Sequence, residues 1–114
     1  MELRSSQKPQ GTIIAVEGEL DLYNAFKLKE LTVKTLGEGA PALIINMSAV
    51  KYIDSSGVGA VIHSYAQCKS KQKPFFVTNL HGTVRRVIEM TKLIGFLPIA
   101  ETEEEALTKL SAAT

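Results

Sequence analysis

Apolar residues along the chain fall first into short strand-like runs. The run Thr12–Val16 is β-branched, and Ala42–Met47 is continuously apolar, which is typical of a strand buried on both faces. A third buried strand is expected at Phe75–Val77, after Pro74. Two weaker strands complete the set: an edge strand around Leu3, ahead of a turn at Pro9–Gly11, and a last strand at 96–100 that contains Pro98.

Helical spacing of apolar residues separates these strands. The chain from Asn24 to Leu36 contains no Gly or Pro, and Gly37, Gly39 and Pro41 are expected to end that helix. Two later stretches, Gly57–Lys71 and 84–91, carry apolar residues at i, i+3, i+4 and i+7, and Gly95 is expected to close the second. Thr102 to Glu105 has the pattern of a capping box, which predicts a terminal helix with Ala106, Leu107 and Leu110 facing inward.

Strands that alternate with helices of about three turns predict right-handed crossovers and parallel central strand pairs. We therefore expect a small α/β fold with one sheet of four to five strands and four helices. A chain of 114 residues is long enough for one hydrophobic core, so residues 1–114 are expected to form a single domain.

Composition and charge exclude several classes of function. Thirteen basic and twelve acidic residues leave a net charge of +1. This charge is too small to indicate binding to nucleic acid or to a membrane surface. Apolar residues nowhere run to the roughly 18 needed to span a bilayer, and the first ten residues lack a signal-peptide pattern. Cys68 is the only cysteine. We expect a cytoplasmic protein that binds neither nucleic acid nor membrane.

The stretch KYIDSSGVGAVIHSYAQ, residues 51–67, concentrates the candidate chemistry. A serine nucleophile on a G-x-S-x-G elbow needs glycine two residues before it, but Ile53 precedes Ser55 at that distance. His63 lies two helical turns further on, opposite the apolar stripe, and is expected to be a surface histidine. With no base, metal cluster or cofactor motif, we expect no enzyme activity, no catalytic residue, no metal and no cofactor.

Three interpretations of this stretch stay open on the residues alone. Asp54, Ser55 and Ser56 are good helix-capping residues, although a cap needs only one of them. Gly57 and Gly59 lie at a helix start, whose free amides favour a nucleotide or small anion, but no phosphate-binding motif accompanies them.

The third interpretation is modification by a kinase. A phosphoserine carries about −1.5 to −2 charges, which a helix N-terminus partly offsets, so the fold would survive while a docked partner would meet new charge. Asp21 and Asp54 add like charge nearby. The residues barely separate Ser55 from Ser56 as the target.

Several motifs together resemble one known family. GELD at 18–21, an apolar strand followed by Ser48, YIDSSGVG at 52–59 and the segment 84–107 resemble the anti-sigma factor antagonists, whose fold is the STAS domain. The resemblance covers nearly the whole chain. It implies a mixed, mostly parallel sheet with helices packed largely on one face. Asn46 stands where many members have aspartate.

The resemblance also implies a partner-switching function. In that family the unmodified protein binds a serine kinase that doubles as the anti-sigma factor, which frees the sigma factor. The kinase phosphorylates the serine after the motif aspartate, here Ser55, and a serine phosphatase reverses the reaction. Asp21 and Asp54 correspond to the flanking acidic residues. The motif neighbours are Ser56, Gly57 and Gly59.

A partner that covers Ser55 is expected to use apolar anchors close by. Tyr23, Asn24 and Phe26 are candidates on the preceding loop and helix. Phe26 and Val33 lie well around from the main stripe of their helix, so the alternative is that they widen its buried face. Arg85 and Arg86 point away from the apolar stripe of their helix and are expected to form a solvated face.

Overall fold

A five-stranded sheet with four helices forms the computed structural model, which describes residues 1–92 and 95–112. The elements in chain order are β1 (Glu2–Lys8), β2 (Gly11–Leu20), α1 (Ala25–Gly37), β3 (Leu43–Ile53), α2 (Ser55–Ser70), β4 (Phe75–Thr78), α3 (Gly82–Met90), β5 (Ile99–Ala100) and α4 (Glu103–Ala112). The strands lie in the order β1-β2-β3-β4-β5. β1 is antiparallel to β2, and the other pairs are parallel. The predicted α/β class with a mixed, mostly parallel sheet is confirmed.

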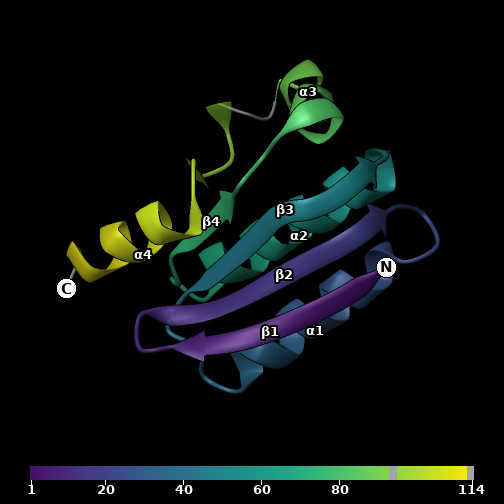
Figure 1. Ribbon diagram of the computed structural model, residues 1–114. Helices are drawn as coiled ribbons and strands as arrows, with labels where there is room; N and C mark the ends of the chain where they lie inside the picture. The colour runs from purple at the N-terminus through teal and green to yellow at the C-terminus, as the bar shows by residue number, and fades with distance from the viewer. Residues whose placement is uncertain (93–94, 113–114) are drawn as a thin grey trace.

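The helices cover the two faces of the sheet unequally (Figure 1). Apolar residues of α1, α2 and α3 join one large cluster with the strands, centred on Ile14, Leu28, Ile45 and Val61. Leu110 and its neighbours on α4 join a smaller cluster on the other face, with residues of β2, β3 and β5. Three helices therefore pack on one face as expected, and α4 covers part of the opposite face.

β3 continues six residues past the end of its apolar run, from Met47 to Ile53, and carries two irregularities. Ala15 and Glu17 of β2, two residues apart, pair with Asn46 and Ala49 of β3, three residues apart, so β3 holds one extra residue there. A second extra residue follows Val50. Each extra residue is a β-bulge, which bends and twists the strand. Inward side chains after Met47 thus recur every third residue, and β3 reaches Ile53 with its buried face preserved.

Other boundaries also differ from the sequence prediction. β2 continues past Val16 to Leu20, and α2 begins at Ser55 instead of Gly57. The expectation that Gly95 closes α3 was wrong, because α3 ends at Met90 and the chain turns at Lys92, where φ is +62°. Residues 93 and 94, within the segment expected to finish that helix, lie outside the described residues. The last strand is reduced to two residues by Pro98.

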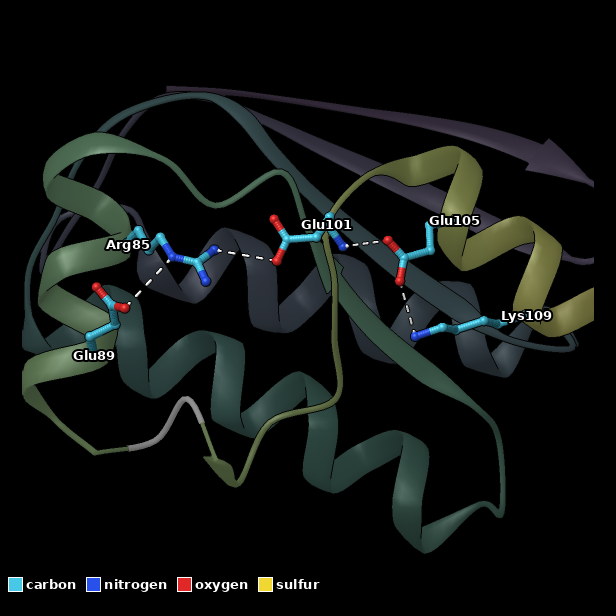
Figure 2. A network of polar contacts seen from close by, with 5 residues as sticks. All are labelled: Arg85, Glu89, Glu101, Glu105 and Lys109. Carbon is cyan, nitrogen blue, oxygen red and sulfur yellow. Dashed lines mark hydrogen bonds and ion pairs between the residues drawn. The ribbon is translucent and has the colours of Figure 1, made fainter.

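α3 and α4 are linked on the surface by a chain of polar contacts (Figure 2). Arg85 pairs with Glu89 at 3.7 Å and with Glu101 at 3.8 Å. The Glu105 carboxylate accepts from the backbone N–H of Glu101 at 3.1 Å and pairs with Lys109 at 3.1 Å. Arg85 therefore lies on the surface of α3, half-exposed and paired with acidic residues of its own chain. Exposed ion pairs stabilise little one by one, so the network adds only modestly to stability.

Candidate partner-binding site

The candidate site is built from the loops that follow β2 and β3. The two strands are parallel neighbours that end together, with Leu20 opposite Ile53. Loops at the carboxyl ends of adjacent parallel strands lie side by side, which is where α/β sheets bind their ligands. The backbone N–H of Asp54 donates to the Leu20 carbonyl at 3.3 Å, so the second loop starts against the first.

Asp54 caps α2 and also ties the two loops together. It has extended backbone angles, and its Oδ1 accepts from the Gly57 N–H at 2.9 Å, the geometry of an N-cap residue. Its Oδ2 accepts from the Leu22 N–H at 3.1 Å, 32 residues away in sequence. Of the three capping candidates, Asp54 is the one that caps. Ser55 and Ser56 therefore lie in the first turn of the helix.

The two serines differ in their accessibility. Ser55 is exposed and Ser56 is half-buried, although they are neighbours in the same helical turn. A kinase must reach the hydroxyl oxygen, and the positive end of the helix favours added negative charge at either position. Ser55 is thus the more accessible of the two hydroxyl groups, a distinction that the sequence alone does not make.

The two motif glycines serve different purposes. A Cβ on Gly57 would lie 2.3 Å from the Leu20 carbonyl oxygen and 2.7 Å from Cγ1 of Ile53, so only glycine lets α2 approach the end of β2. A Cβ on Gly59 would meet no atom beyond its own helix and chain neighbours within 4 Å, among the residues described. Contacts within the described chain thus explain Gly57 and leave Gly59 unexplained.

Asp21 and Asn24 shape the β2–α1 loop from within. The Asp21 carboxylate accepts from the Tyr23 N–H at 3.0 Å. The Asn24 side chain accepts from the Asp21 N–H at 2.9 Å and donates to the Glu19 carbonyl at 2.8 Å. Both polar side chains are half-buried in these bonds, so they position their apolar neighbours and offer a partner little surface of their own.

Large apolar side chains stand out from this loop and the first turn of α1. Leu22 is 68% exposed, Tyr23 84% and Phe26 51%. The alternative that Phe26 and Val33 widen the buried face of α1 was wrong, since Val33 is also half in solvent. We call Leu22, Tyr23, Phe26, Ser55 and Gly59 the docking surface.

Sequence reasoning missed two exposed apolar residues near these loops. Leu22 lies between two predicted site residues, and an amphipathic pattern is no guide to it because it belongs to no helix or strand. Tyr52 is 50% exposed near the end of β3, where the bulges break the alternation that would have marked it as outward.

His63 differs from its expected surroundings, and Asn46 has a structural role of its own. His63 was expected at the surface but is half-buried, with a buried Nδ1 that has no hydrogen-bond partner among the residues described. Asn46 donates from its side chain to Glu103 at 2.9 Å and accepts from the Ser48 N–H at 2.8 Å. Asn46 therefore connects β3 to the start of α4, on the sheet face away from α2.

The geometry at the start of α2 disfavours an anion site at Gly57. The amide that a phosphate would use already donates to the Asp54 carboxylate, which places a negative charge there. Within residues 1–92 and 95–112, no group of three or more His, Cys, Asp or Glu side chains is arranged to hold a metal. No helix in the described part of the chain is long and apolar enough to cross a membrane.

Comparison with known proteins identifies the family. Residues 2–106 match the STAS domain family. The anti-sigma-B factor antagonist of Listeria monocytogenes is 33% identical over 93 residues, which cover 81% of each chain. An anti-sigma factor antagonist from Mycobacterium paratuberculosis has the same fold, with a TM-score of 0.86, 27% identity and coverage of 96% of this chain and 93% of that one. A STAS domain protein from Planctomyces limnophilus superimposes with a TM-score of 0.83 at 18% identity, covering 96% of this chain and 97% of that one.

The fold and the two-loop site define a STAS domain. The chain belongs to the STAS domain family, among the anti-sigma factor antagonists. These relatives are named for regulation of another protein and not for a reaction that they catalyse. The family resemblance found in the motifs is thereby confirmed.

Proposed function

We propose that this protein is a partner-switching regulator whose single STAS domain binds an anti-sigma factor through the docking surface. The observation that carries this proposal is the exposed serine, Ser55, beside solvent-exposed apolar side chains on two loops joined by Asp54. Interfaces gain most of their free energy from a few large apolar or aromatic anchors, which Tyr23 and Phe26 supply. The names of the relatives supply the kind of partner, an anti-sigma factor.

In this proposal the partner is also a serine kinase that switches off the interaction. It transfers the γ-phosphoryl group of ATP to Oγ of Ser55, whose proton passes to a base of the kinase, and ADP is released. The phosphate adds about −1.5 to −2 charges at a point that already holds the Asp54 carboxylate. Binding then weakens, the anti-sigma factor returns to its sigma factor, and a serine phosphatase restores Ser55.

The phosphorylated helix start stays folded in this scheme. The added charge lies at the positive end of α2, a 16-residue helix, which stabilises an anion by about 0.3–1 kcal/mol. The phosphate therefore acts on the partner and leaves the sheet and the core unchanged. Asp21, Asn24 and Gly57 contribute by holding the loops in place.

Peptide mass spectrometry on protein purified from its own cells tests the modification. We expect one phosphate on Ser55, absent in Ser55→Ala and retained in the matched control Ser56→Ala. A phosphate confined to Ser56, or none under any growth condition, would contradict the switch. Pull-down with the unmodified protein as bait then identifies the kinase. The same kinase is expected not to be captured by the Ser55→Asp variant.

A further inference from the structure

β1 presents an open sheet edge. Its seven residues pair with β2 one for one, from Glu2 opposite Glu17 to Lys8 opposite Gly11, without a bulge or proline. Figure 1 shows β1 at the border of the sheet, with no described element beyond it. Proteins usually protect such an edge with a bulge, a proline, a covering segment or charged side chains, because its free peptide groups pair readily with another strand. Of these protections β1 has only charged side chains, those of Glu2, Arg4 and Lys8.

The hydrogen bonding of β2 shows which peptide groups of β1 point outward. The Thr12 N–H donates to the Ala42 carbonyl, on the side away from β1. Peptide groups alternate in direction along a strand, so Gly11 and Ile13 face β1, where their partners are Lys8 and Ser6. The outward groups of β1 are consequently those of the intervening residues, Leu3, Ser5 and Gln7.

These outward groups match those of a second copy in one antiparallel register. A two-fold axis at Ser5 places Ser5 opposite Ser5, and Leu3 opposite Gln7, so that every outward N–H meets an outward carbonyl. A register centred on Gln7 would bring Pro9, which has no N–H, into the ladder. A register centred on Leu3 would leave Gln7 unpaired. A register centred on Ser6 would also bring in Pro9, and one centred on Arg4 would pair the outward groups but place Arg4 opposite Arg4. Among these registers, the one centred on Ser5 pairs all three outward residues without a proline or opposed like charges.

Charge complementarity favours the same register. Glu2 falls opposite Lys8 of the second copy, and this pair occurs twice because of the symmetry. Arg4 falls opposite Ser6, so no two like charges face each other across the new strand pair. These are non-hydrogen-bonded positions, where opposed side chains are closest and opposite charges stabilise an antiparallel sheet.

The helix beneath the edge offers apolar surface beside it. α1 lies under β1 and β2 in Figure 1, and Leu3 lines a groove with Leu31 and the polar stems of Lys27, Glu30 and Lys34. Leu3 and Leu31 are both half-buried. Pairing of two β1 edges would bring these side chains of both copies toward the two-fold axis and bury more of their apolar surface.

We propose that the β1 edge pairs with the β1 edge of a second copy of this chain, forming a homodimer with one continuous ten-strand sheet. Ser55 follows β3, two strands away from the edge. The dimer contact uses β1, Leu3 and Leu31, and it includes no residue of the docking surface. The homodimer thus does not depend on the proposed function, and a test of one does not decide the other.

Sedimentation equilibrium of the full chain, from micromolar to millimolar concentration, tests the homodimer. The wild type is expected to show a monomer–dimer equilibrium. Ser5→Pro removes two hydrogen bonds of the dimer, and none between β1 and β2, and is expected to raise the dimer Kd at least about tenfold. Ser6→Ala is the matched control and is expected to leave Kd unchanged. Circular dichroism verifies that each variant is folded.

Charge reversal provides a second test that does not depend on proline. Glu2→Lys and Lys8→Glu each place like charges opposite one another twice and are expected to raise Kd about tenfold. The double variant restores opposite charges and is expected to restore dimerisation. A wild type that stays monomeric at millimolar concentration would overturn the proposal. So would a dimer whose Kd is unaffected by Ser5→Pro or by the single charge reversals.

Discussion

The Asp54 carboxylate accepts a hydrogen bond from the Leu22 backbone N–H at 3.1 Å and so joins the loop after β3 to the loop after β2. Its second oxygen caps α2 through Gly57. One side chain therefore sets the position of both the exposed serine and the exposed aromatic residues. The cap of α2 and the arrangement of the docking surface therefore both depend on Asp54.

Replacing Asp54 is expected to loosen the first loop as well as the helix. Asp54→Ala removes both acceptors and should lower the free energy of unfolding by about 1–2 kcal/mol, measured by urea denaturation. Amide exchange of Leu22 should accelerate. The matched variant Asp54→Asn retains one acceptor oxygen, which should still cap α2 through the Gly57 N–H. The Leu22 amide should nevertheless exchange faster than in the wild type, because its acceptor is lost. Unchanged Leu22 exchange in both variants would rule out the bridging role.

The two motif glycines are expected to respond to alanine in opposite directions. Gly57→Ala places a methyl group against the Leu20 carbonyl and should cost about 1–3 kcal/mol of unfolding free energy. Gly59→Ala has room for its methyl group and should stabilise the helix by about 0.5–1 kcal/mol. Thermal and urea unfolding of the pair compare them directly. Equal effects of the two substitutions would contradict the close packing described for Gly57.

The exposed aromatic residues are expected to matter for binding and not for folding. Tyr23→Ala and Phe26→Ala should each weaken binding of the anti-sigma factor by about 1–2 kcal/mol in calorimetry. Their unfolding free energies should stay within about 0.5 kcal/mol of the wild type. Met90, an apolar residue on α3, is 75% exposed, so Met90→Ala is the control and should bind normally. Normal binding by both aromatic variants would place the interface elsewhere.

The single cysteine is expected to be unreactive in the folded protein. Burial raises the pKa of the Cys68 thiol from 9.0 to about 11, so the reactive thiolate is scarce near neutral pH. Labelling with a thiol reagent at pH 8 should be slow in buffer and rapid in urea. The folded state favours the neutral thiol, so stability should fall as the pH rises from about 9 to 11. Rapid labelling without denaturant would contradict this burial.

Sequence patterns predict most of this fold because the helices carry strong apolar stripes and the central strands are continuously apolar. They fail at β3, where bulges after Asn46 replace a period of two with a period of three. They also fail at the end of α3, where Lys92 adopts a left-handed conformation that usually requires glycine. The half-buried position of His63 follows from packing between helices, which no single helix pattern contains.

The sequence predicts which residues form the candidate site but not the separate role of each. The motif from Tyr52 to Gly59 identifies the region, yet the separate tasks of Gly57 and Gly59 depend on the distance to Leu20, 37 residues before Gly57. Likewise, the role of Asp54 in joining the two loops depends on the Leu22 N–H, 32 residues before it. Contacts between distant segments decide these roles, and a linear pattern does not record them.

The most direct test of the partner switch is calorimetric titration of the purified anti-sigma factor with three forms of this protein. The unmodified wild type and Ser56→Asp should bind with similar affinity, since Ser56 is half-buried. Ser55→Asp should bind at least about tenfold more weakly, because it places a fixed charge on the docking surface. Equal affinity of Ser55→Asp and the wild type, with both proteins folded, would contradict a switch centred on Ser55.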